Sequence, residues 1–138
     1  MLVSSRRNIE RARNFRKALG GGMRQAGILA AAGLVALNEM TGRLQEDHDN
    51  AKFLAGALSE LPQVELDPAL VQTNIVIFSL RGGGDAQALV SALASRDVLA
   101  GTVGPHSVRL VTHHDVDRAA CERASAILAE EIQKWDGR

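Results

Sequence analysis

The segment from Ala26 to Leu37 restricts the possible folds most, because nearly all of its residues are apolar. It is long enough for a helix, and a helix that is apolar on every side is expected to be buried. Gly27 and Gly33 would each cost that helix up to ~1 kcal/mol relative to alanine, so we expect both to pack closely against a neighbouring backbone. A chain of 138 residues offers little cover for such a helix. The segment therefore predicts contact with further sequence, a partner subunit, or both.

The flanking sequence predicts an α+β fold, with long helices first and a sheet after them. Helices are expected over residues 43–61 and 117–134, where apolar residues recur every three to four positions. Two more are expected over residues 5–19, which are rich in Arg, Ala and Lys and end at three glycines, and over residues 85–96, where Asp85 is the cap. Leu2 and Val3 are expected to form the end of a strand, and four further strands are expected over residues 63–66, 73–80, 98–103 and 107–112. Short connections between the last strands favour a mostly antiparallel sheet that helices cover on one side. Pro62 marks a plausible boundary between residues 1–61 and 62–138.

The bulk composition excludes several classes of function. Sixteen basic residues balance sixteen acidic residues, so there is no electrostatic case for nucleic acid or an anionic membrane. No apolar run approaches the ~18 residues of a membrane span, and the first residues lack the order of a secretory signal. Cys121 is the single cysteine, which rules out a disulfide within the chain and favours a reducing cytoplasm. Its helical neighbours indicate a small packing residue rather than a nucleophile.

The run Gly20-Gly21-Gly22 is the most unusual local feature of the chain. Glycines let a backbone adopt positive φ and approach a ligand closely, and the free N–H groups of the helix that follows favour an anion. Lys17 and Arg24 flank the turn, and both are long enough to reach a phosphate. The run matches neither a Walker loop nor the dinucleotide fingerprint. From the residues alone, a plain tight turn between two helices and an anion site both stay open.

Two further features have an open interpretation at this stage. Arg109 lies within a predicted strand, where it either faces solvent or points into a cleft as a bidentate carboxylate clamp. His113 and His114 are adjacent at a strand end. Neighbouring strand residues point to opposite faces, so the pair rarely shares one metal ion, and we predict no metal site.

Four motifs in order resemble one family. They are Arg16-Lys17-x-Leu-Gly-Gly-Gly-Met-Arg-Gln-Ala-Gly27, Glu46-Asp47-His48-x-Asn50-Ala51, Gln72-Thr73-Asn74-Ile75-Val76 and Val108-Arg109-Leu110-Val111-Thr112-His113-x-Asp115-Val116. Together they resemble the low-specificity L-threonine aldolases, which belong to the β-eliminating lyases with the aspartate-aminotransferase-like fold. Small departures are Ser4, where the family often has glycine, and His114, where leucine is common. The resemblance extends over essentially the whole chain.

The resemblance implies a cofactor, a reaction and roles for four residues. The cofactor is pyridoxal 5'-phosphate (PLP), and the reaction is retro-aldol cleavage of L-threonine or L-allo-threonine to glycine and acetaldehyde. Lys17 and Arg24 resemble the basic residues near the cofactor phosphate. Arg109 resembles the arginine that holds the α-carboxylate of the amino-acid substrate, and Asn74 resembles a residue close to that site. Residues 1–61 then correspond to the helical tail of the PLP-binding large domain with interface helices, and residues 62–138 to the small C-terminal domain.

The resemblance also predicts what this chain lacks. The family's Schiff-base lysine precedes the segment that begins at Leu2, and Lys17, Lys52 and Lys134 do not match its motif. Because that chemistry needs an amine at the cofactor aldehyde, we expect the chain alone to be inactive and to act in a homo-oligomer or with a complementing N-terminal segment. A standalone, non-catalytic α+β module that binds an anionic amino acid or mediates assembly is the alternative.

Overall fold

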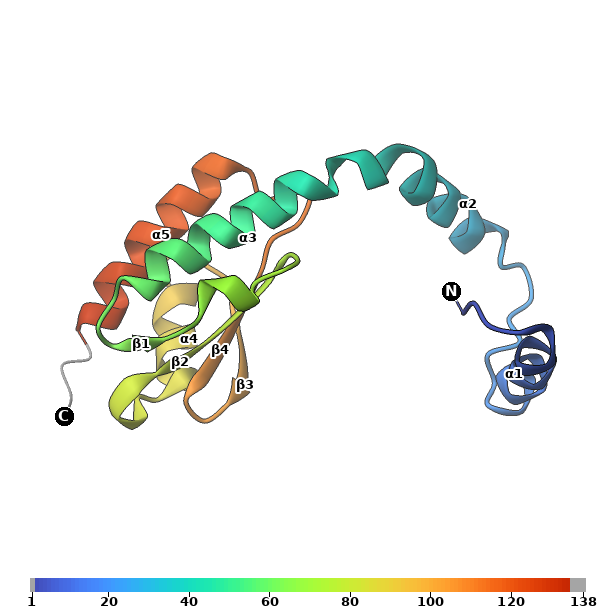
Figure 1. Cartoon of the computed structure of the whole chain (residues 1–138), viewed down its shortest axis with the longest axis horizontal. Coiled ribbons are helices and arrows are strands. Elements are labelled where there is room, and N and C mark those ends of the chain that lie inside the picture. Colours follow the sequence, from blue (N-terminus) through green and yellow to red (C-terminus); the bar gives the residue numbers. More distant parts are fainter. Residues whose placement is uncertain (1, 135–138) are drawn as a thin grey trace. The chain divides into compact units, whose positions relative to one another are not determined.

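The computed structural model describes residues 2–134, which fall into two compact units divided between Thr41 and Gly42 (Figure 1). The larger unit holds the sheet and the helices packed on it. Trp135 continues the three-to-four spacing of apolar residues in the last predicted helix, and it lies outside the described residues.

The N-terminal unit consists of helices that carry no buried side chain. Helix α1 spans Arg6–Ala18, and its first turn is capped by Ser5, whose side chain accepts a hydrogen bond from the Asn8 backbone N–H. Helix α2 spans Gly27–Val35 and continues into a π-helical turn at Ala36–Met40 and a 3-10 turn at Thr41–Arg43. No described residue of α1, α2 or these turns is buried.

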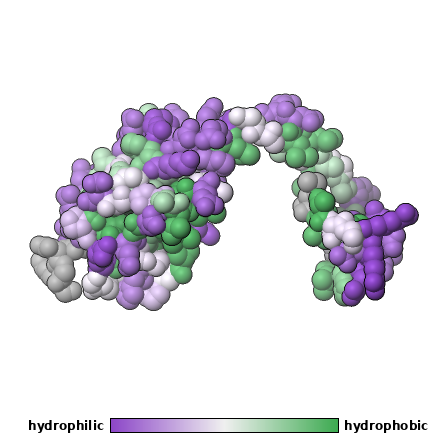
Figure 2. All heavy atoms as spheres, viewed as in Figure 1, coloured by the Kyte–Doolittle hydropathy of each residue, from purple (hydrophilic) through white to green (hydrophobic). Residues whose placement is uncertain are grey.

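The N-terminal unit departs from one expectation, the strand at Leu2 and Val3, and leaves the cover of α2 a prediction. Leu2 and Val3 are in no strand, because no described strand lies beside them to complete a ladder. Helix α2 forms as predicted but is not buried within this chain: Ile28 is 84% exposed and Leu34 59%, and apolar side chains gather along it in Figure 2. A Cβ added to Gly27 or Gly33 would meet nothing within 4 Å, so no backbone packs closely against either glycine here.

The C-terminal unit is the predicted α+β unit. Helix α3 spans Leu44–Ser59 and is followed by strand β1 at Val64–Glu65, a 3-10 turn at Pro68–Leu70 and strand β2 at Ile75–Leu80. A second 3-10 turn at Arg81–Gly83 leads to helix α4 at Ala86–Ala94, strands β3 at Gly101–Gly104 and β4 at Ser107–Val111, and helix α5 at Arg118–Gln133. The carboxylate of Asp85 caps α4, as predicted, and that of Asp117 caps α5.

The four strands form one antiparallel sheet with the order β1-β2-β4-β3. Alternate side chains of β2 and β4 are buried, which shows that α3, α4 and α5 cover one face and leave the other face open. Figure 1 shows α3 and α5 lying side by side along this layer. The predicted α+β class with helices on one side is therefore confirmed. The core comprises Ala51, Leu54, Leu58, Val76, Phe78, Leu89, Leu93, Val108, Leu128 and Ile132, among others.

The observed elements are shorter than the predicted ones at several ends. The predicted strand at residues 98–103 begins only at Gly101, and the helix predicted to reach Arg96 ends at Ala94. Asp97 breaks this helix with a φ of 60°, a conformation that neither a helix nor a strand continues. The domain boundary at Pro62 stays a prediction. Within the described residues no helix is both long and apolar enough to cross a membrane.

Candidate functional site

The glycine turn after α1 has a local structural reason for two of its three glycines. Gly20 has a φ of 77°, which favours glycine, and it ends α1 by donating its N–H to the Lys17 carbonyl. Gly21 donates its N–H to the Arg16 carbonyl over 2.7 Å. A Cβ on Gly21 would lie 3.2 Å from that oxygen and 3.0 Å from the Arg16 Cγ, so a side chain would not fit without a shift.

The turn delivers the chain to the start of α2 with two exposed cations nearby in sequence. Lys17 and Arg24 are both exposed, and within residues 2–134 neither forms an ion pair. No side chain caps α2, whose N-cap residue is Ala26. Uncapped N–H groups at a helix start and two unpaired cations are the chemistry that binds a phosphate. No described contact brings Lys17 and Arg24 together.

Arg109 lies at the middle of β4, on the face of the sheet that the helices leave open. Its ladder partners are Ile77 on β2 and Gly101 on β3. The guanidinium lies beside Gly101, where an added Cβ would be in ordinary van der Waals contact with it, at 3.9 Å. Ile77 and Val111 beside it are 49% and 43% exposed. Within residues 2–134 Arg109 forms no ion pair, so an exposed guanidinium in apolar surroundings is available to a carboxylate.

A hollow lies on the same open face beside Ile77. It has a volume of about 650 Å³, and it is lined by Glu65, Leu66, Asp67, Leu70, Val71, Ile75, Ile77, Ser79 and Arg81. Arg81 is held at its rim because its Nε donates to the Val64 carbonyl over 3.0 Å. The open face therefore offers a mainly apolar depression next to the residue that pairs with Arg109.

Asn74 is the predicted site residue that the structure places away from Arg109. Asn74 precedes β2 and lies opposite Thr112, one step beyond the pair formed by Ile75 and Val111. Its Nδ2 donates to the Thr112 carbonyl over 2.8 Å, and its own carbonyl accepts from the Thr112 N–H over 3.0 Å. The structure brings Asn74 to Thr112, and no described contact joins it to Arg109.

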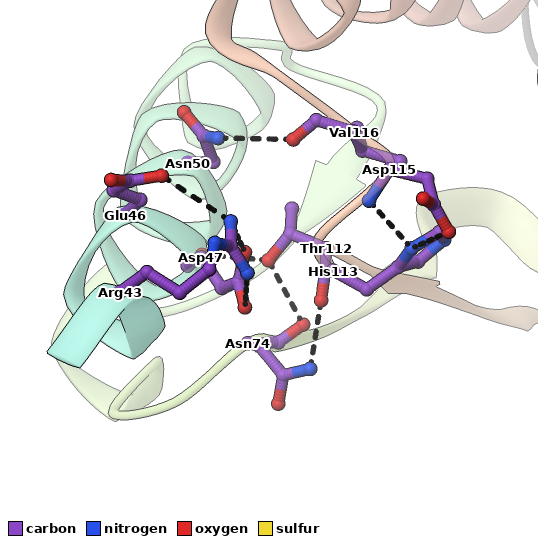
Figure 3. Close-up of polar contacts among 9 residues, drawn as sticks. All are labelled: Arg43, Glu46, Asp47, Asn50, Asn74, Thr112, His113, Asp115 and Val116. Carbon is purple, nitrogen blue, oxygen red and sulfur yellow. Dashed lines mark hydrogen bonds and ion pairs between the residues drawn. The ribbon is translucent and has the colours of Figure 1, made fainter. Parts of the chain in front are cut away.

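Thr112 and Asp47 complete a buried polar cluster that Figure 3 shows at the end of this ladder. The Thr112 hydroxyl donates to the Asp47 carbonyl over 2.6 Å, and both residues are buried. The Asp47 carboxylate accepts two hydrogen bonds from Arg43, over 3.0 and 3.2 Å, and Arg43 also reaches Glu46. These bonds raise the pKa of the Arg43 guanidinium above its ordinary value, and the bond to Asp47 has the largest effect.

Sequence reasoning missed this cluster, although its members lie within the quoted motifs. Asp47 and Thr112 are 65 residues apart, so nothing in either motif indicates the contact. One signal was present: Thr112 has the same strand parity as Val108 and Leu110, which face the core. A polar side chain at a core-facing position needs a hydrogen-bond partner.

Cys121 and the histidines have no part in this site. Cys121 is fully buried on α5, and burial raises the pKa of its thiol, which keeps the thiol protonated. The His113 Nδ1 lies 3.5 Å from Asp115, with both side chains exposed. Within the described residues no group of three His, Cys, Asp or Glu side chains has the arrangement of a metal site.

Comparison with solved structures defines the class of fold first. Two structures of C-DES each match 76% of this chain and 28% of theirs, with a TM-score of 0.62 and 27% identity. One is a mutant with glycine covalently linked to the PLP cofactor, and the other is a complex of the cystine C-S lyase with its product cysteine persulfide. The chain thus has the α+β fold of part of a PLP-dependent lyase.

Sequence comparison then gives the family. The beta-eliminating lyase family matches residues 1–81, and this chain belongs to that family. The low specificity L-threonine aldolase of Escherichia coli (strain K12) is 44% identical over 126 residues, which are 91% of this chain and 36% of that protein. Low-specificity L-threonine aldolase 1 of Arabidopsis thaliana is 38% identical over 118 residues, 84% of this chain and 33% of that protein. The chain spans about a third of the length of these curated relatives.

Proposed function

We propose that this chain is the C-terminal part of a PLP-dependent threonine aldolase, which cleaves L-threonine or L-allo-threonine to glycine and acetaldehyde. The observation that carries the proposal is Arg109, an exposed guanidinium without an ion-pair partner within residues 2–134, on the open face of the sheet. A guanidinium in this setting suits the α-carboxylate of an amino acid. The 44% identity to the E. coli aldolase supports the choice of reaction.

The N-terminal unit fits the phosphate of the cofactor. Lys17 and Arg24 are exposed and flank the glycine turn, and α2 begins without a side-chain cap. We assign these two cations and the first N–H groups of α2 to the phosphate. When bound, PLP supplies an electron sink for the bond cleavage, while the protein supplies binding and orientation. Asn74, which the resemblance associates with the substrate side, lies at the end of the β2–β4 ladder that carries Arg109.

The lysine that bonds the cofactor in this proposal lies outside the chain. The Lys134 Nζ forms an ion pair with the Glu131 carboxylate over 2.7 Å. Lys52 projects from the exposed side of α3. Lys17 belongs to the phosphate side. The chain alone is therefore proposed to be inactive, and to act with an N-terminal segment that carries the lysine.

The exposed apolar residues of α2 support a protein partner in the active state. Ile28, Leu29 and Leu34 are between 59% and 84% exposed, which is unusual for a helix of such composition. Cover for this helix comes, in the proposal, from the N-terminal segment or from a second copy of the chain. Sedimentation velocity of the chain alone tests this: we expect self-association or aggregation, and a stable monomer would contradict it.

A chimeric enzyme tests the proposed reaction. The C-terminal third of the E. coli aldolase is replaced by residues 1–138 of this chain, and acetaldehyde release from threonine is measured in the presence of PLP. The two sequences align over 91% of this chain, which gives the fusion a defined register. We expect turnover above that of the truncated E. coli enzyme. A folded chimera that retains PLP without turnover would contradict the proposal.

Arg109 provides the sharper test within the chimera. Arg109→Leu removes a charge-assisted pair with the substrate carboxylate, which costs about 2–5 kcal/mol, and this corresponds to a roughly 30-fold to several thousand-fold increase in KM. Arg109→Lys keeps the charge and loses the bidentate geometry, so it is expected to rescue only part of the loss. PLP binding, measured by absorbance, should not change. An unchanged KM in Arg109→Leu would refute the assignment.

The alternative function is a standalone module, and one observation favours it. The C-terminal unit has its own core, formed by α3, the sheet, α4 and α5, which is what a domain needs to fold independently. It predicts that the chain alone is monodisperse and binds an anionic amino acid. Isothermal titration of the chain with glycine or threonine separates the two functions, because the aldolase proposal expects no measurable heat without the N-terminal segment.

A further inference from the structure

The side chains of Asn74 and Arg109 belong to opposite faces of the sheet. Val108 and Leu110 of β4 are buried under the helices, whereas Arg109 and Val111 are exposed on the open face. Thr112 continues the buried series and is itself 1% exposed. Asn74 pairs with Thr112 at this point of the ladder and precedes the exposed Ile75 and the buried Val76, so strand alternation assigns it to the helix-covered side. Direct contact of Asn74 with a substrate held by Arg109 does not follow from this arrangement.

The contacts of Asn74 instead close the end of the ladder between β2 and β4. The Thr112 N–H and the Asn74 carbonyl form the last main-chain bond, and the Asn74 amide returns a bond to the Thr112 carbonyl. The Thr112 hydroxyl then fastens this corner to the Asp47 carbonyl on α3 (Figure 3). We call Asp47, Asn74 and Thr112 the strand clamp.

The strand clamp lies on the β2 side of β4, the strand that carries Arg109, and the pairing of β2 with β4 is regular. On the other side of β4, the pairing with β3 is interrupted by a register shift between Thr102 and Gly104. Strand register decides which face each side chain occupies, because a slip of one residue moves every side chain to the opposite face. The β2 ladder and its clamp are therefore what hold the Arg109 guanidinium on the open face.

Two further contacts hold the α3 side of the clamp in place. The buried Asp47 carboxylate is bound by both terminal nitrogens of Arg43, which fixes the first turn of α3. The Asn50 amide, one turn further along α3, donates to the Val116 carbonyl over 3.3 Å. This second tie fastens the chain after β4, so the segment from Arg109 to Val116 is anchored to α3 at two points.

We propose that the strand clamp positions Arg109 for the substrate carboxylate, and that Asn74 and Thr112 are positioning residues which do not touch the substrate. This inference rests on the proposed function, because it takes Arg109 as the carboxylate-binding residue. It changes the expected role of Asn74 from direct binding to support of β4.

The first experiment tests the clamp itself and needs no activity. Amide hydrogen exchange is measured on the full chain for wild type, Thr112→Val and Asn74→Ala, with Ser59→Ala as the matched control. Ser59 also donates its hydroxyl to a carbonyl of α3, that of Gly56, at the far end of the helix. Loss of one clamp hydrogen bond should speed exchange of residues 109–112 roughly 5- to 10-fold, and Ser59→Ala should leave them unchanged. Equal exchange in Thr112→Val and wild type would overturn the inference.

The second experiment tests positioning in the chimeric aldolase. Thr112→Val and Asn74→Ala should raise KM for threonine about tenfold with little change in kcat or PLP absorbance, and Thr112→Ser, which keeps the hydroxyl, should restore KM. In the Arg109→Leu background, Thr112→Val should have no further effect on KM, because the two residues act as one unit. Additive effects would overturn the inference. If Arg109→Leu alone leaves KM unchanged, the proposed function fails. The hydrogen-exchange experiment then still tests, independently of activity, whether the strand clamp stabilises residues 109–112.

Discussion

A matched pair of leucine substitutions tests how the two units differ in stability. Leu58 on α3 is 2% exposed and belongs to the core, whereas Leu34 on α2 is 59% exposed. Leu58→Ala removes buried methyl groups and leaves a cavity, so we expect a loss of about 2–5 kcal/mol in the free energy of unfolding. Leu34→Ala removes little buried surface and introduces a better helix former, so we expect a change of about 1 kcal/mol or less.

Urea denaturation of the chain, followed by far-UV circular dichroism, measures both values. The midpoint should fall clearly for Leu58→Ala and stay close to wild type for Leu34→Ala, with the main transition reporting the C-terminal unit. A dependence of the Leu34→Ala result on protein concentration would identify self-association through α2. If Leu34→Ala costs as much as Leu58→Ala at low concentration, then α2 is covered within the chain, and our description of the N-terminal unit is refuted.

Three other predictions follow from single residues. Gly20→Ala places an L side chain at a φ of 77°, which costs roughly 1–2 kcal/mol locally, and should speed amide exchange over residues 16–22. Hydrogen bonds from Lys134 and, second, from Arg96 lower the pKa of the Glu131 carboxyl. Its contribution to stability is therefore present above about pH 4.5, the ordinary pKa of the group, and is lost as the pH falls through the lowered pKa. In Glu131→Gln, the urea midpoint should fall less steeply at acid pH than in wild type. Cys121 should react with a thiol reagent only at the rate of unfolding, and fast labelling in native buffer would contradict its burial.

The sheet was predictable from sequence because its signals are local. The alternation around Val108 and Leu110 and the β-branched run of β2 determine both the strands and their buried face. Asp85 marks the start of α4 through a cap that depends on the next three residues. Predictions of this kind need no knowledge of distant contacts.

The remaining features depend on partners that sequence patterns do not identify. The composition of α2 predicts a helix that needs cover, and the residues described do not supply it, so the identity of the covering segment stays a prediction. Asn74 was assigned near the substrate by resemblance, and its hydrogen-bond partner Thr112, 38 residues away, could not be read from the motif. The bond from Thr112 to Asp47 spans 65 residues and joins two motifs that look independent in the sequence. The strand that carries Arg109 was predicted from sequence, whereas the face that Arg109 occupies needed the structure.

The most direct test of the central claim compares this chain with and without an N-terminal segment. The chain alone is mixed with PLP and threonine, and the visible absorbance of a lysine-bonded cofactor and the release of acetaldehyde are recorded beside those of the chimeric enzyme. We predict neither signal from the chain alone and both from the chimera, with turnover that depends on Arg109. A lysine-bonded absorbance band together with acetaldehyde from the chain alone would contradict the account.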